Sequence, residues 1–188
     1  MRKIILFACL LGILQANAQP QKPAILNQSA ALLFKGVKSK LTVVEKNYLA
    51  QKSKLTLSPN KKKFILKDDP ESDYEVSVYP VDLNKDGIEE LFITENSFFF
   101  GQGGGPFTLY IKDLKGVYQV AASSSGIPMI LKTISVGFPD LLVGGAGMEL
   151  PIWQYNGKIY SYKKSTQDQS IKGTSLEDAS AAYSKNLK

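Results

Sequence analysis

A nine-residue segment, Asp82 to Glu90, is the feature that most constrains this chain. It reads Asp-Leu-Asn-Lys-Asp-Gly-Ile-Glu-Glu and runs directly into the apolar residues Leu91-Phe92-Ile93. Oxygen-bearing side chains stand at positions 1, 3, 5 and 9 of the segment, and Gly87 at position 6 permits a sharp turn. The apolar and partly β-branched residues that follow favour a strand. The segment therefore predicts a tight loop that opens directly into a β-strand.

The spacing of oxygen atoms in this loop predicts a Ca²⁺ site. Calcium takes roughly six to eight oxygen ligands, and such a loop wraps them round one point. Position 12 is Ile93, where a helix–loop–helix calcium site would have a bidentate Glu, so Glu90 would supply the last carboxylate. The alternative is a solvated Asp/Asn/Gly turn without an ion. The expected ligands are the side chains of Asp82, Asn84, Asp86 and Glu90 and the main-chain carbonyl of Ile88.

The stretch DLNKDGIEELFI resembles the calcium loops of FG-GAP and VCBS-type repeats of secreted, integrin-like proteins. Those repeats join a loop of the form D-x-[DN]-x-D-G-x-x-[DE]-L to an immediate strand. The resemblance covers residues 82–93 and implies calcium binding in a β-rich module. A weaker second copy, residues 137–143, reads Gly-Phe-Pro-Asp-Leu-Leu-Val, fifty residues after Gly87. The second copy lacks the upstream acids, so no ligand is expected there, and two units are too few for a propeller.

The first 18 residues have the pattern of a secretory signal peptide. Arg2 and Lys3 precede an apolar run that is too short to span a bilayer, and Ala16-Asn17-Ala18 gives a small-x-small cleavage site. We expect cleavage after Ala18 and a secreted or periplasmic protein. The alternative is a lipoprotein with Cys9 as the lipidated residue.

The composition of the remaining 170 residues, 19–188, suits one domain and excludes several chemistries. The chain has no histidine, which excludes Ser-His-Asp catalysis and His-based zinc sites. Its one cysteine lies in the signal segment, so no disulfide framework is expected. Basic residues exceed acidic ones only mildly, and no nucleic-acid-binding motif is present.

Helices are expected only towards the two ends of this domain. A short helix fits residues 24–36. Thr42 and Glu45 form a capping-box pattern that opens a helix over Val43 to Lys52, with Val44, Tyr48 and Leu49 facing the core. The domain then divides into a helical, basic part (19–63), a β core that holds the calcium loop (64–163) and a polar tail with a helix starting near Ser175 (164–188).

Between these ends, short apolar runs separated by turn signals predict β structure. The fold class is mainly β (α+β), an antiparallel meander or sandwich of about seven short strands with flanking helices. The glycine-rich residues 98–106 are expected to form a flexible loop. A strand over 74–81 leads into the calcium loop, and the strands expected after it are 90–94, 107–112, 117–121, 128–132, 140–143, 151–155 and 158–162.

These features predict a secreted or periplasmic calcium-binding module with a structural or binding role rather than an enzyme. Its expected partner is an envelope or extracellular protein or a glycan, with neither nucleic acid nor a membrane span. Two alternatives stay open: an inhibitor of an enzyme such as lysozyme, and a hydrolase that uses paired carboxylates. The hydrolase would need two carboxyl groups at a defined separation, and the adjacent Glu89 and Glu90 would point to opposite faces of a strand.

Overall fold

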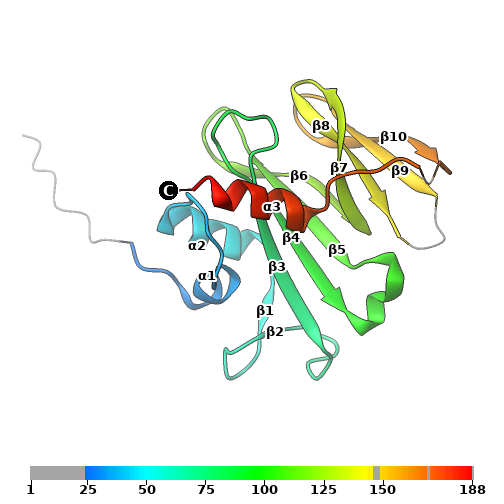
Figure 1. Cartoon of the computed structure of the whole chain (residues 1–188). Coiled ribbons are helices and arrows are strands. Elements are labelled where there is room, and N and C mark those ends of the chain that lie inside the picture. The colour runs from blue at the N-terminus through cyan, green and yellow to red at the C-terminus, as the bar shows by residue number, and fades with distance from the viewer. Residues whose placement is uncertain (1–23, 146–148, 169, 188) are drawn as a thin grey trace, which may run out of the picture.

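The computed structural model describes residues 24–145, 149–168 and 170–187 and confirms the mainly β fold class (Figure 1). Ten strands form three antiparallel sheets, accompanied by short helices. The first four-stranded sheet has the order β3 (Tyr74–Val81), β4 (Glu90–Ser97), β5 (Pro106–Lys112) and β6 (Tyr118–Ser125). The second has the order β7 (Ile127–Ser135), β8 (Phe138–Gly144), β9 (Leu150–Tyr155) and β10 (Tyr160–Thr166). The two sheets are therefore successive four-stranded meanders.

The expected strands are present, but several are longer than the sequence pattern indicates. In addition, β1 (Thr56–Leu57) and β2 (Phe64–Ile65) form a ribbon in and beside the part expected to be helical. The prediction of a purely flexible loop over 98–106 is wrong, because residues Phe98–Gly103 form the short 3₁₀ helix η1. Ser97 caps it by accepting a hydrogen bond from the N–H of Phe99, and Gly101 has a φ of +57° at a kink inside it.

A capping residue precedes each of the three α-helices. α1 (Gln28–Leu33) is shorter than the helix expected over 24–36 and is capped by Asn27, whereas α2 (Val43–Lys52) has the predicted capping box, with both bonds between Thr42 and Glu45. Ser175 caps α3 (Leu176–Lys185) by accepting from the N–H of Asp178. Leu49 is fully buried and Tyr48 packs against the core as expected. The expectation for Val44 is wrong: its side chain lies on the solvent face of α2 and is 64% exposed.

Strand β4 lies inside the first sheet and is buried on both faces. Leu91 and Ile93 belong to a core shared with α1 and α2, whereas Phe92 between them packs into a second core with residues of β8 such as Leu141. Successive side chains of a strand point to opposite faces, so an unbroken apolar run is what a strand between two cores requires. The second core joins the two sheets, and the predicted calcium loop leads into this strand, which is an inner strand of the first sheet.

The predicted signal peptide and its cleavage site lie outside the described residues. Among the residues that the structure does describe, none of the helices has the length and apolar character needed to cross a membrane.

Candidate functional site

The predicted calcium loop is the hairpin connection between β3 and β4. Val81 pairs with Glu90, so the two strands close the loop at its base. Within the loop, Lys85 has a φ of +61° and Gly87 a φ of +85°. A positive φ is strained for most residues, but glycine adopts it without a steric penalty. Gly87 therefore lets the chain make this turn with little backbone strain.

Three side chains shape the loop by accepting hydrogen bonds from its own backbone. Oδ2 of Asp82 accepts from the N–H of Gly87 at 3.0 Å, and Oδ1 of Asn84 accepts from the N–H of Asp86 at 3.1 Å. Oδ1 of Asp86 accepts from the N–H of Ile88 at 2.7 Å. Each bond fixes one oxygen of its side chain and turns the backbone inward, so the predicted ligand residues determine the shape of the loop.

The second carboxylate oxygen of Asp82 is the least satisfied atom of the loop. Oδ1 of Asp82 is buried and has no hydrogen-bond partner among the described residues. A buried, unpaired carboxylate oxygen is costly unless a hydrogen bond or a cation compensates for its lost hydration. Oδ2 of Asp86, by contrast, accepts from the side-chain amide of Asn84 at 2.8 Å.

Glu90 closes the loop from the first position of β4. Its side chain is 1% exposed, and its Oε2 accepts from the N–H of Leu83 at 2.7 Å. Burial raises the pKa of Glu90 to about 8, and the negative charges of Asp86 and Asp82 add to that rise. A bound cation would lower the pKa of Glu90 again, because its positive charge would stabilise the ionised carboxylate and offset the charges of Asp82 and Asp86.

The predicted ligands offer the carboxylate and amide oxygens that a hard divalent cation prefers. In the described part of the chain, no three acidic side chains already converge as a metal-binding group. The hydrogen bond between Asn84 and Asp86 accounts for part of this, because it holds one carboxylate oxygen of Asp86 against the amide. An ion would take the place of that bond and would also satisfy Oδ1 of Asp82. Ile88, the remaining predicted ligand, lies in the same turn and holds Asp86 through its N–H.

Glu89, next to the predicted ligand Glu90, connects the loop to the N-terminal segment. Its carboxylate accepts from the hydroxyl of Ser39 at 2.7 Å and from the N–H of Lys40 at 2.5 Å. The ammonium group of Lys40 also donates to the carbonyl of Gly87 at 3.4 Å. The two adjacent glutamates thus contact different parts of the chain: Glu89 lies just before β4 and bonds to the N-terminal segment, whereas Glu90 begins β4 and bonds within the loop. The partners of Glu89 escape sequence reasoning because they lie about fifty residues away along the chain.

Tyr183 of helix α3 lies close to the loop and to the Glu89 carboxylate. The pKa of the Tyr183 hydroxyl is raised by burial first and then by the charges of Glu89, Asp82 and Glu90. The ring of Tyr183 also lies 5.7 Å from the ammonium group of Lys40. The loop is therefore packed between the N-terminal segment and the C-terminal helix, two parts of the chain that the sequence pattern does not connect to it.

In the second copy of the repeat, hydrogen-bond donors surround the residue equivalent to Glu90. Asp140 is 3% exposed, and its carboxylate accepts from Thr133 at 2.7 Å, from Ser135 at 2.6 Å and from the side-chain amide of Gln154 at 3.1 Å. These three side chains provide the compensation that a buried carboxylate needs. The sequence predicts no ion here because the upstream acids are missing, and these three hydrogen bonds are a second physical reason to expect none.

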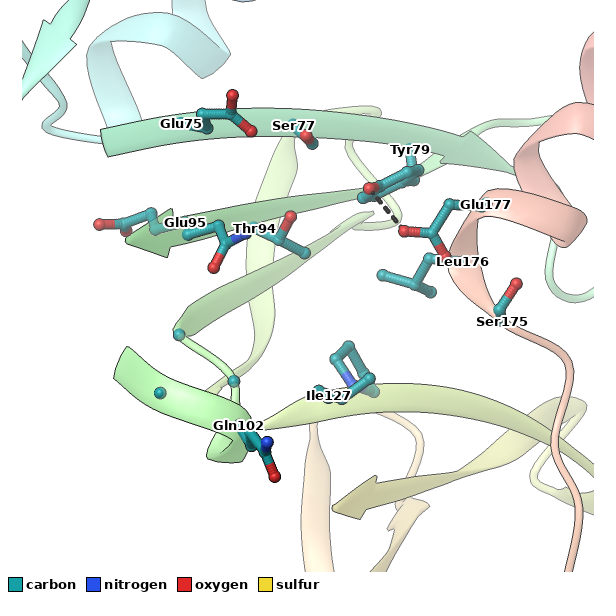
Figure 2. Close-up of a pocket in the computed structure, with 16 residues that line it drawn as sticks. Glu75, Ser77, Tyr79, Thr94, Glu95, Gln102, Ile127, Ser175, Leu176 and Glu177 are labelled. Atoms are coloured by element: carbon teal, nitrogen blue, oxygen red, sulfur yellow. Dashed lines mark hydrogen bonds between the residues drawn. The ribbon is translucent and has the colours of Figure 1, made fainter. Parts of the chain in front are cut away.

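A separate pocket of about 390 Å³, lined by both polar and apolar surface, lies between the first sheet, the start of β7 and the start of α3 (Figure 2). Ser77, Tyr79 and Thr94 line its upper wall in this view, and the Tyr79 hydroxyl donates to Glu177 of α3 at 2.9 Å. Such a wall can hydrogen-bond a small polar ligand. Near this pocket, Phe98 of η1 is 91% exposed, so an aromatic side chain reaches the surface here.

Comparison with protein-family models, with curated proteins and with solved structures finds no match for this chain.

Proposed function

We propose that this protein is a secreted or periplasmic calcium-binding module in which the ion has a structural role. The observation that carries the proposal is the buried, unpartnered Oδ1 of Asp82. It lies in a loop whose oxygen spacing is that of a calcium site, like the FG-GAP and VCBS-type loops that the sequence resembles. The ion would be held by Asp82, Asn84, Asp86 and Glu90, with the carbonyl of Ile88 and water completing its shell.

The ion would neutralise a cluster of acids at the entrance to the central strand β4. Three carboxylates give a charge of −3 against the +2 of the ion, and the buried Glu90 gains most because its ionised form lacks a compensating cation. Without the bidentate Glu of a helix–loop–helix site, we expect a dissociation constant on the order of 10⁻⁴ M. Mg²⁺ should compete poorly, since it holds its water molecules and requires a rigid octahedron.

Thermal melting with Ca²⁺ and then with chelator tests the proposal. At a free Ca²⁺ concentration of about 100 times the dissociation constant, the ion should add about 2.7 kcal/mol to the free energy of unfolding. The substitution Asp86→Ala should abolish that gain. Asp113→Ala is the matched control, because Asp113 also accepts backbone N–H groups in a hairpin turn, those of Lys115 and Val117. If the wild-type midpoint does not move with calcium, the loop is a bare turn and the proposal fails.

A further inference from the structure

Two buried polar atoms near the predicted calcium loop lack a hydrogen-bond partner among the described residues. One is Oδ1 of Asp82, and the other is the hydroxyl of Tyr183, near the end of α3. A third such atom in this part of the chain, Nε1 of Trp153, belongs to a residue that packs against the core between the two sheets. Because a buried polar group without a partner is costly, the two atoms at the loop call for a common explanation.

The Tyr183 hydroxyl lies among acids, but Glu89 does not depend on it as a donor. Burial, followed by the charges of Glu89, Asp82 and Glu90, raises the pKa of this hydroxyl, so it keeps its proton. One oxygen of the Glu89 carboxylate already accepts from a side-chain hydroxyl of the N-terminal segment, and the other accepts from a main-chain N–H of the same segment. The hydroxyl of Tyr183 is therefore available for another partner at the loop.

Lys40 connects the ring of Tyr183 to the backbone of the loop. Its ammonium group lies 5.7 Å from the centre of the ring and donates to the carbonyl of Gly87 at 3.4 Å. The N–H of the same glycine donates to Asp82. Helix α3 also packs against β3, the strand that leads into the loop (Figure 1). These contacts hold the end of α3 at the loop, with the unpartnered hydroxyl among the loop acids.

We propose that Tyr183 is a further residue of the calcium site and that its hydroxyl couples ion binding to the docking of α3. The coupling rests on the calcium function proposed above, in which water completes the shell of the ion. A tyrosine hydroxyl can accept from such a water molecule and donate its proton to a loop carboxylate. The ion orders both of these partners, so the hydroxyl is best satisfied when the loop is loaded.

The coupling must act in both directions, because linkage between two equilibria is reciprocal. The factor by which calcium stabilises docked α3 equals the factor by which docked α3 raises calcium affinity. One hydrogen bond of this kind corresponds to about three- to tenfold. The first residues of the same helix, Leu176 and Glu177, line the pocket of Figure 2. An ion that fixes α3 would therefore also fix one wall of that pocket.

Calorimetric titration with Ca²⁺ and hydrogen exchange test the coupling on residues 19–188, the form expected after signal cleavage. In the wild type, calcium should slow exchange of the α3 amides by about three- to tenfold relative to EDTA. The amides of β10, at the edge of the second sheet, should change little. Tyr183→Phe keeps the ring beside Lys40 and removes only the hydroxyl. It should weaken calcium affinity and reduce the calcium effect on α3 by the same factor, whereas the loop amides should still respond to calcium.

Tyr162→Phe is the matched control, since it makes the same change at a tyrosine of β10 that is 61% exposed, and it should behave as the wild type does. In EDTA, Tyr183→Phe should melt with the wild type, because the hydroxyl has no partner to lose among the described residues. If Tyr183→Phe binds calcium as tightly as the wild type, or destabilises the protein equally with calcium and with EDTA, the coupling is refuted while the calcium function stands. A flat titration of the wild type would instead refute the calcium function and the coupling with it.

Discussion

Tyr118 and Tyr160 are equivalent residues in the two four-stranded sheets. Each begins the last strand of its sheet, and each donates its buried hydroxyl to a main-chain carbonyl beside the second strand: Tyr118 to Glu89 at 2.8 Å and Tyr160 to Pro139 at 2.7 Å. Glu89 and Pro139 are fifty residues apart, the same spacing as the sequence repeat. The two meanders therefore share a specific internal contact as well as a strand order.

Removing either hydroxyl should destabilise the protein. Tyr118→Phe or Tyr160→Phe leaves a buried carbonyl without this donor, which should lower the free energy of unfolding by about 1–3 kcal/mol. Urea unfolding measures the loss. Tyr162→Phe is the control, because Tyr162 is 61% exposed and its hydroxyl can bond to water instead, so a change below about 0.5 kcal/mol is expected. If all three substitutions change the free energy of unfolding equally, the hydrogen bonds to the two carbonyls do not stabilise the protein more than an exposed hydroxyl does.

The stability of the calcium-free protein should fall as pH rises. The pKa of Glu90 is about 8 in the folded protein against a usual value of 4.5, so the folded state retains a proton that the unfolded chain releases. This contribution is fully present below about pH 4.5 and is lost as pH rises to about 8, with a slope of up to about 1.4 kcal/mol per pH unit. Calcium binding, which needs the ionised carboxylate, should strengthen over the same interval.

Urea unfolding in EDTA at pH 5, 6.5 and 8 measures this dependence, with Glu90→Gln as the comparison. The glutamine variant cannot ionise at this position, so its stability should change less between pH 5 and 8 than that of the wild type. If both proteins show the same pH profile, Glu90 is not the group responsible.

The cap of α2 should contribute to stability through local hydrogen bonds alone. Thr42→Ala removes the side chain that accepts from the N–H of Glu45 and should cost about 1 kcal/mol. Val44→Ala, a change to a smaller residue on the exposed face of the same helix, should stay within about 0.5 kcal/mol. Chemical denaturation distinguishes the two variants, and a neutral Thr42→Ala would mean that tertiary packing alone fixes the start of this helix.

Local signals predict some elements of this fold to the residue and miss others. The start of α2 at Val43 can be predicted because the capping box that fixes it joins residues only three positions apart, Thr42 and Glu45. In contrast, β6 extends to Ser125 because its serines pair with residues of β5: Ser124 lies opposite Phe107. The pattern of these serines does not predict a strand. They form one because they pair with β5.

The candidate site divides in the same way. The shape of the loop follows from residues within it, and sequence reasoning singled out Asp82, Asn84, Asp86 and Gly87 but not Lys85, whose φ is also positive. Its surroundings, Ser39 and Tyr183 among them, come from distant segments that no motif marks.

Asp140 supplies the sharpest test of the difference between the two copies of the repeat. Its buried carboxylate is compensated by Thr133, Ser135 and Gln154, so Asp140→Ala should leave these donors without an acceptor and cost about 2–4 kcal/mol. Because no ion is needed there, calcium should raise the melting midpoint of this variant by as much as it raises that of the wild type. Asp82→Ala should do the reverse: it removes the unpaired oxygen and should abolish the calcium response. Thermal melting of both variants with Ca²⁺ and with EDTA separates the two roles. If Asp140→Ala loses the calcium response, the ion depends on Asp140, and the assignment of the site to the Asp82 loop is wrong.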